Sequence, residues 1–303
     1  MSSSNFARRQ FLGALALAGS SCLAVNALAE PLEQPVYRVA KKIEFTPKQP
    51  GDHPLDPAIR FAKEGLDHIQ ADVKDYECVI IKRERVKGTL GGYEYMYAKI
   101  RNRKVVNGKM EVPLSVYLKF LKPESVEGRE VIWVEGQNKG KLIAHEGGLL
   151  GRFSVPLDPE GAMAMKGNLY PITHIGIENL VAKLIERGEK DKGFDPSGKE
   201  TEVEFKAGAK INKRPCTVLS VKHTIQRPNY DFELAQIFID DEMKIPVRYV
   251  AYGWSNGTAT GPVLEEYTYT NVKINQGYEN IDFDPRNPKY NYKGGIGNPG
   301  NNP

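Results

Sequence analysis

The sequence has few of the residues that build metal and redox sites. Its 303 residues include three Cys and five His, and only Cys78 and Cys216 lie outside the N-terminal leader described below. Two cysteines are too few for a structural zinc site. A Cys78–Cys216 disulfide is compatible with an oxidising compartment, and so are two buried thiols. The histidines lack metal-ligand spacing, so neither a metal nor a cofactor is expected; they are His53, His68, His145, His174 and His223.

Charge of one sign is not in excess either. Lys and Arg number 42 against 38 Asp and Glu, a net charge of +4, which falls to about +2 without Arg8 and Arg9. This balance argues against a nucleic-acid groove or a polybasic membrane patch. Beyond the leader, no apolar run approaches the roughly 20 residues of a membrane span. The mature chain is therefore expected to have no transmembrane segment and no nucleic-acid partner.

The first 29 residues have the organisation of an export signal. Arg8 and Arg9 precede an apolar stretch over 11–28, and small residues end it at Ala29. The Arg-Arg-x-Phe-Leu run resembles a bacterial twin-arginine signal, which is an address and not an anchor. We expect cleavage after Ala29 and a periplasmic or otherwise exported location. A single membrane helix, the general export route, and lipid attachment at Cys22 are the less favoured alternatives.

The remaining chain predicts one domain with a lead-in and a tail. Residues 30–57 are rich in Pro and indicate an extended lead-in, and residues 284–303 are rich in Pro, Gly and Asn and indicate a flexible tail. Helical spacing of apolar residues occurs over 58–69 and 175–189, with Gly188 as a candidate stop for the second helix. Residues 156–170 indicate a loop or short helix.

Strand periodicity dominates the region between 58 and 283. Runs rich in β-branched and aromatic residues alternate with turn signals such as Asn107-Gly108. We therefore predict an α+β fold, mainly antiparallel, with a single strongly curved sheet whose helices cover one face. The predicted strands are 76–86, 93–101, 113–121, 130–134 and 141–145, then 201–205, 216–226, 232–240, 246–254 and 263–274.

Several runs resemble the bacterial family known as domain of unknown function family 1571. The resemblance covers roughly residues 60–285 and includes PLSVYLKF at 113–120, LDPEG at 157–161, YGW at 252–254 and EYTYTNV at 266–272. The second half also resembles the broader LolA-like superfamily of periplasmic lipoprotein carriers, in which an Asp ends one strand and a Pro opens the next. That resemblance implies a half-barrel with a concave apolar face lidded by helices, and a role in holding an acyl chain. The lid-locking arginine of lipoprotein carriers matches no residue here.

Alternation supplies candidate residues for an apolar ligand cavity. The predicted strands 113–121 and 216–226 would each present their apolar residues on one face, and the predicted helix 175–189 would lie opposite them. Two methionines between 156 and 170 would suit an adaptable lid. The alternative is that all of these side chains fill an ordinary core. The candidates are Leu114, Val116, Leu118, Phe120, Met163, Met165, Ile177, Leu180, Leu184, Leu219, Val221 and Ile225.

Catalytic signatures are missing from the sequence. No nucleophile elbow, phosphate loop or zinc-protease pattern occurs, and each histidine fits a structural role better than that of a base. The acidic run 240–242 fits a hairpin turn. The favoured interpretation is an exported, non-catalytic protein that shelters a lipid or other apolar small molecule. The alternatives are an envelope scaffold whose concave face binds a protein and, less favoured, a hydrolase.

Overall fold

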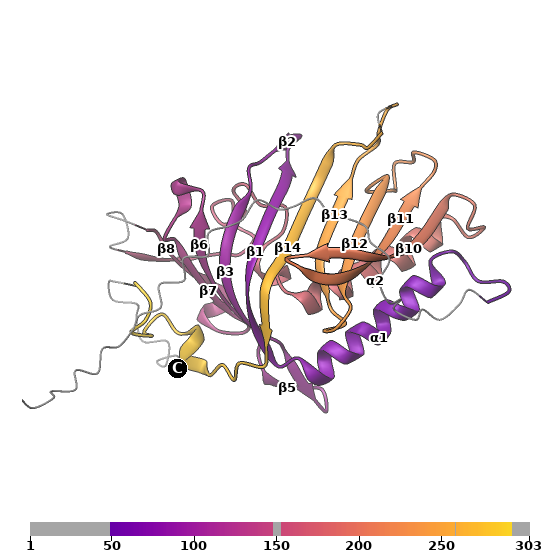
Figure 1. The fold of residues 1–303 in the computed structure, drawn as a ribbon. Helices are drawn as coiled ribbons and strands as arrows, with labels where there is room; N and C mark the ends of the chain where they lie inside the picture. The colour runs from indigo at the N-terminus through magenta and orange to yellow at the C-terminus, as the bar shows by residue number, and fades with distance from the viewer. Residues whose placement is uncertain (1–48, 148–152, 258, 293–303) are drawn as a thin grey trace, which may run out of the picture. The chain divides into compact units, whose positions relative to one another are not determined.

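The computed structural model describes residues 49–147, 153–257 and 259–292, all within the compact unit Gln34–Pro303 (Figure 1). The predicted signal peptide, with its cleavage site after Ala29, lies outside the described residues. So do residues 30–48 of the predicted lead-in and residues 293–303 of the predicted tail.

A twelve-stranded antiparallel sheet forms most of the fold, in the order β10-β11-β12-β13-β14-β1-β3-β6-β7-β8-β9, with β2 paired to β1. Strands β1 and β14 pair at its centre, where Ile80 lies opposite Tyr269. No pairing among the described strands joins β10 to β9, so the sheet is open. The predicted α+β class with a mainly antiparallel sheet is confirmed. The strands are β1 (Asp75–Val86), β2 (Thr89–Leu90), β3 (Glu94–Arg101), β6 (Ser115–Lys122), β7 (Glu130–Val134), β8 (Leu142–His145), β9 (Ser154–Leu157), β10 (Thr201–Ile211), β11 (Arg214–His223), β12 (Leu234–Asp240), β13 (Pro246–Tyr252) and β14 (Val263–Ile274).

Some strands differ from their predicted limits for physical reasons. The pattern predicts that the strand starting at Thr201 ends at Phe205, but β10 continues to Ile211. A register shift between Lys206 and Ala209 interrupts the alternation, so a period of two cannot be followed through it. A separate two-stranded hairpin, β4 (Lys104–Val106) and β5 (Lys109–Val112), turns at the Asn107-Gly108 signal but was not predicted as strands.

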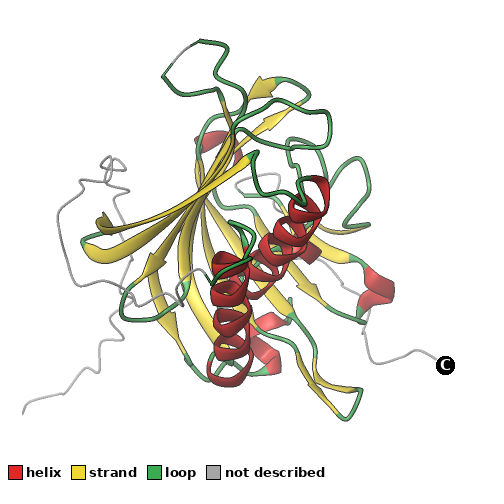
Figure 2. Cartoon of the chain, turned by 90° about the vertical axis from the view of Figure 1, so that its right-hand side faces the viewer, coloured by secondary structure: helices red, strands yellow, loops and turns green. Residues whose placement is uncertain are grey.

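Two helices pack against the sheet. Helix α1 (Asp56–Asp72) has Pro57 in its first turn, where the missing N–H costs no hydrogen bond. Helix α2 (Ile177–Phe194) begins after Gly176, and the N–H of Ile177 donates to Tyr76 Oη at 2.8 Å. Figure 2 shows both helices on the same side of the sheet. Short 3₁₀ turns are η1 (Glu124–Val126), η2 (Asn138–Gly140), η4 (Ile172–His174) and η5 (Asn280–Phe283).

The prediction that Gly188 stops the second helix is wrong, because α2 continues to Phe194. Gly188 instead lies where the two helices meet. A Cβ atom there would be only 3.1 Å from Ile59 Cγ1 of α1. The residue is a glycine that permits close helix packing, which a sequence pattern cannot distinguish from a helix stop.

Two buried clusters lie between the helices and the sheet. The larger one joins Ile69 of α1 and Ile177 of α2 to strand residues that include Tyr76, Ile100 and Phe238. The second joins Ile59 of α1 to β11, β12 and β13 through residues that include Leu219, Val221, Ile237 and Tyr249. The helices and the sheet therefore share one continuous apolar interface, because Leu180 and Ile185 pack against both clusters.

Part of the opposite face of the sheet, over β3, β6 and β7, contacts the C-terminal segment that follows β14 (Figure 1). Tyr290 stacks on Tyr117 with a centroid separation of 4.1 Å, and the N–H of Asn291 donates to Glu130 Oε2 at 3.0 Å. Residues 284–292, which composition places in a flexible tail, thus pack on β6 and β7. This segment has few aliphatic residues, and its tyrosines supply the apolar surface that it buries against the sheet.

Candidate functional site

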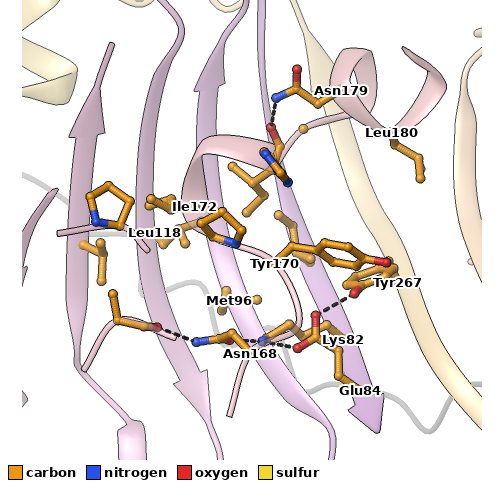
Figure 3. Close-up of a pocket in the computed structure, with 18 of the residues that line it drawn as sticks. Lys82, Glu84, Met96, Leu118, Asn168, Tyr170, Ile172, Asn179, Leu180 and Tyr267 are labelled. Atoms are coloured by element: carbon orange, nitrogen blue, oxygen red, sulfur yellow. Dashed lines mark hydrogen bonds and ion pairs between the residues drawn. The ribbon is translucent and has the colours of Figure 1, made fainter. Parts of the chain in front are cut away.

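One cavity of about 560 Å³ lies against the face of the sheet that carries the helices. This volume falls within the range of about 300–1,000 Å³ that small-molecule sites have. Side chains of eight strands, from Tyr249 on β13 to Leu157 on β9, form one wall. Helix α2 and the segment 158–176, which connects β9 to α2, form the other wall. Figure 3 shows side chains from both walls pointing toward the same space.

The central part of the cavity is apolar because alternating residues of neighbouring strands are in register. Ile80 lies opposite Tyr269 on β14 and Met96 on β3, and Met96 lies opposite Phe120 on β6. These four side chains form one row across four strands. Ile172 and Leu180 face this row from the other wall (Figure 3). The arrangement offers an apolar ligand contacts on both sides.

One end of the cavity is polar and carries buried charges. Lys82 donates to Glu84 Oε2 at 3.2 Å and to Asn168 Oδ1, and the hydroxyl of Tyr267 donates to Glu84 Oε1 at 2.5 Å. The N–H of Leu169 also donates to Glu84, at 3.0 Å. Segment 158–176 is therefore fixed to β1 by residues at its centre (Figure 3).

A second carboxylate, Glu265, lies beside this network. Tyr249 donates to Glu265 Oε1 at 3.2 Å, the Tyr267 hydroxyl oxygen lies 3.3 Å from Glu265 Oε2, and Arg187 of α2 lies 3.7 Å away. Burial raises the pKa of Glu265 above its usual value, although Arg187 and the tyrosines oppose the shift. Burial, and then the charges of Glu265 and Glu84, also raise the pKa of Tyr267, so its hydroxyl stays protonated and remains a donor.

The polar end therefore joins the walls of the cavity. Within this network Glu84 and Glu265 accept hydrogen bonds, and Lys82 and Arg187 are paired with carboxylates: Lys82 with Glu84 and Glu94, Arg187 with Asp231 and Glu265. Among the described residues, no group of three or more His, Cys, Asp and Glu could hold a metal ion. The chemistry available to a ligand is apolar contact along the cavity and hydrogen bonding at its end.

The predicted cavity residues fall into four groups. Leu118, Phe120, Met163, Leu180 and Leu184 line the large cavity, and Met163 is 74% exposed at its edge. Leu114, Val116 and Ile177 lie in the packed core instead, as the alternative interpretation has it. Leu219 and Val221, again with Leu184, line a separate cavity of about 90 Å³. Met165 is partly buried and does not line the large cavity, and Ile225 is 48% exposed on the surface.

The polar residues of the site were not predicted from the sequence, although the sequence contains one signal for them. Along β1, Tyr76, Cys78 and Ile80 are buried on the face that Lys82 and Glu84 continue. A charged pair that occupies the inward positions of an otherwise apolar strand indicates a polar site. Asn168, Tyr170 and Arg187 had no such signal, because their roles depend on how distant segments meet.

The histidines occupy structural or peripheral positions. His223 is fully buried, its Nε2 lies 3.2 Å from Asp191 Oδ2, and its ring stacks on Tyr230 at 3.9 Å. His145 is buried on β8, beside Tyr292. His174 is exposed at the cavity wall. Thr201 Oγ1 lies 3.4 Å from His223 Nδ1, but both residues are buried and neither lines the large cavity.

Cys78 and Cys216 are free thiols in the structure, and both are buried. Burial raises the pKa of Cys78 well above its usual value and that of Cys216 to about 12. Of the two possibilities that the sequence leaves open, the structure thus contains the buried thiols. The acidic run 240–242 forms the turn between β12 and β13, where Arg214 pairs with Asp240 and Glu242.

Within the part of the chain that the structure describes, no helix combines the length and apolar character needed to cross a bilayer.

Sequence and structure comparisons place the chain among known proteins. The family described as "Protein of unknown function (DUF1571)" matches residues 73–292. No curated protein matches the chain. Among solved structures, a DUF1329 family protein from Desulfovibrio piger is 8% identical, with 77% of this chain and 98% of that chain covered and a TM-score of 0.36.

Two further solved structures are similar at comparable levels. A LolA superfamily protein from Nitrosomonas europaea is 8% identical, covers 75% of this chain and 97% of its own, and has a TM-score of 0.27. The MucA/MucB complex of Pseudomonas aeruginosa matches at 14% identity, with 75% of this chain and 60% of that chain covered and a TM-score of 0.41.

Proposed function

The chain belongs to the DUF1571 family, and we propose that it is an exported, non-catalytic protein that shelters a lipid or other apolar molecule. The observation that carries this proposal is the cavity of about 560 Å³ with an apolar row at its centre and a hydrogen-bonded polar end. An elongated apolar ligand with a small polar group matches both parts. Leu118, Phe120, Leu180 and Leu184 are the predicted residues that would contact it.

The proposal includes a strongly curved, half-barrel sheet whose concave face holds the cavity. Eight neighbouring strands contribute to one cavity. Helix α2 lines the same cavity as these strands. A strongly curved sheet would bring its outer strands toward α2, so the shared lining supports the helix-covered concave face.

The proposal also includes export and the domain limits. Residues 1–29 would direct the chain through the twin-arginine route and be removed after Ala29, leaving the lead-in and the predicted domain 58–283, extended to α1 from Asp56 and to the packed residues 284–292. Changing Arg8 and Arg9 to Lys should leave the chain unprocessed in the cytoplasm, as followed by immunoblotting of cell fractions. Processing of the double variant at the normal rate would contradict the twin-arginine route.

Native mass spectrometry of protein purified from its own cell envelope tests the binding function directly. We expect a co-purified apolar molecule, and saturable binding of a fluorescent fatty acid to the delipidated protein. If no apolar ligand co-purifies and the fluorescent fatty acid does not bind, the proposal fails. A stable protein partner in the same preparation would then favour the scaffold alternative.

A cavity-filling substitution locates the binding. Ala144 of β8 lines the cavity, so Ala144→Phe places a ring inside it and should weaken fatty-acid binding about tenfold or more. Ala71→Phe is the matched control, because it makes the same change at an exposed position of α1 that does not line the cavity. Equal binding by the two variants would place the ligand elsewhere.

A further inference from the structure

A third cavity, of about 440 Å³, lies on the opposite face of the sheet. Arg101 at the end of β3, Val134 at the end of β7 and Ile143 of β8 form its floor. The turn around Asn138 and the C-terminal segment from Asn280 to Arg286 form its sides. The sheet separates this cavity from the proposed ligand site, because Tyr97 and Tyr117 pack on this face whereas Met96 and Leu118 line the other cavity.

Arg101 is the distinctive residue of this cavity. Its Nη2 donates to Ser115 Oγ at 3.1 Å, and its guanidinium lies 5.1 Å from the centre of the Phe283 ring. Its Nε is buried and makes no hydrogen bond. Within the described residues it forms no ion pair, unlike Arg103 two positions along, which holds Glu135 through two hydrogen bonds of 2.7 Å.

The carboxylates around Arg101 pair with other groups. Asp282 pairs with Lys99 at 2.8 Å, and Asp284, which lines the cavity, pairs with Arg286, which lines it too. Asp75 accepts hydrogen bonds from the N–H groups of Gln276 and Tyr278. Burial lowers the pKa of Arg101 below its usual value, although Asp75 and Asp282 oppose the shift. Arg101 is half-buried and has no counter-ion of its own among the described residues. An anion that enters the cavity would therefore supply the ion pair that this guanidinium lacks.

Neutral donors surround the same space. Gln137, Asn138 and Asn280 line the cavity, and the structure gives their side-chain amides no hydrogen bond to any described residue. A guanidinium fork with amide donors on two sides matches the planar or tetrahedral oxygens of an oxyanion. We propose that this cavity is a binding site for an oxyanion group, a carboxylate or a phosphate, held by Arg101 and the amides of Asn138 and Asn280.

The experiment is a titration of the purified protein with inorganic phosphate and, separately, with acetate. Nitrogen-detected NMR follows the Arg101 Nε–H, and the thermal midpoint is recorded at constant ionic strength. We expect saturable shifts of this resonance and a rise in the midpoint with at least one of the two anions. The anion that binds more tightly identifies the source as a phosphate or a carboxylate.

Arg101→Gln should weaken binding about tenfold or more, since it removes the charge-assisted fork. Arg103→Gln is the matched control: it removes the same charge from the same part of the molecule but outside the cavity. Asn138→Asp keeps side-chain size, places a negative charge beside Arg101 and should also abolish binding. It serves as the second variant if Arg101→Gln does not fold. The proposal is overturned if neither anion saturates the wild type, or if Arg101→Gln or Asn138→Asp binds like Arg103→Gln.

Discussion

The two halves of the sheet carry the same alternation of apolar side chains but are covered differently. Over β10–β13, helices α1 and α2 pack against residues such as Leu219 and Ile237 and leave about 90 Å³. Over β1–β9, much of the cover is the irregular segment 158–176, and about 560 Å³ remains. Regular helices interdigitate with a sheet at high density, whereas an irregular segment must also satisfy its own backbone groups. The cover, more than the strand pattern, decides where a cavity lies.

The largest expected effect is a difference in stability loss when a phenylalanine in each half of the sheet is replaced by alanine. We call the part of the sheet over β10–β13, which the helices cover, the closed half. Phe232 is buried in this closed half, and Phe120 lies partly exposed beside the large cavity. Phe232→Ala should lower the free energy of unfolding by about 3–5 kcal/mol, because it removes a ring from a packed cluster in which only about 90 Å³ is empty. Phe120→Ala should cost much less, because its neighbours already border empty space. Urea unfolding with unchanged m-values measures both. Equal losses would contradict the difference in packing.

A second comparison concerns carboxylates on the two faces of the sheet. Burial alone would raise the pKa of Glu77 on the outer face, but hydrogen bonds from Lys273, Tyr97 and Tyr278 lower it to about 2. Its ordinary value is 4.5, so its stabilising contribution is complete above pH 4.5 and is lost as the pH falls through 2. Glu77→Gln should therefore cost about 2–3 kcal/mol at pH 7 and nothing near pH 2.

Glu265 on the cavity side should show the opposite sign. Its pKa is raised by burial, so the folded state binds a proton that the unfolded state releases first. The free energy of unfolding should therefore fall as the pH rises from 4.5 through the folded pKa. Glu265→Gln should remove this slope, measured as the difference between variant and wild type across the pH range. A slope that persists in the variant would mean that another group causes it.

The sequence predicts the elements of the fold better than their contacts. The alternation of Leu114, Val116, Leu118 and Phe120 predicts one shared face, and β6 has these residues on or just before it. The same alternation cannot predict that Val116 packs in the core while Phe120 borders the cavity. That distinction depends on which part of segment 158–176 or α2 lies above each residue. A local pattern contains no information about a cover 50 residues away.

The polar end of the site shows the same limit. Lys82 and Glu84 could have been identified from their inward positions on β1, because charges on a buried face require partners. Their partners Asn168 and Tyr267 come from distant segments, so the network itself could not be inferred. The packed residues 284–292 were missed because composition predicts flexibility from few aliphatic residues and gives too little weight to Tyr290 and Tyr292.

Forcing α1 and α2 apart in the closed half should create there a larger cavity, like the one in the other half of the sheet. Gly188 allows α2 to approach α1, and an added Cβ would already be 3.1 Å from Ile59. Gly188→Leu should therefore force the helices apart and cost about 1–3 kcal/mol. The separation should enlarge the small cavity and let an apolar dye bind there, as dye fluorescence can measure. An unchanged midpoint and no new dye binding would show that the closed half tolerates the bulk without opening.

The smallest expected effect is the control for that substitution, on the same helix. Gly193 also lies within α2, but a Cβ atom added there would have nothing within 4 Å. Its backbone φ is not among those in the left-handed region, so alanine adopts the same conformation without strain. Gly193→Ala should raise the free energy of unfolding by about 0.5–1 kcal/mol, because alanine loses less conformational entropy in a helix. A loss of stability at Gly193 would mean that α2 resists any side chain near its C-terminus. The loss at Gly188 would then no longer report on helix contact alone.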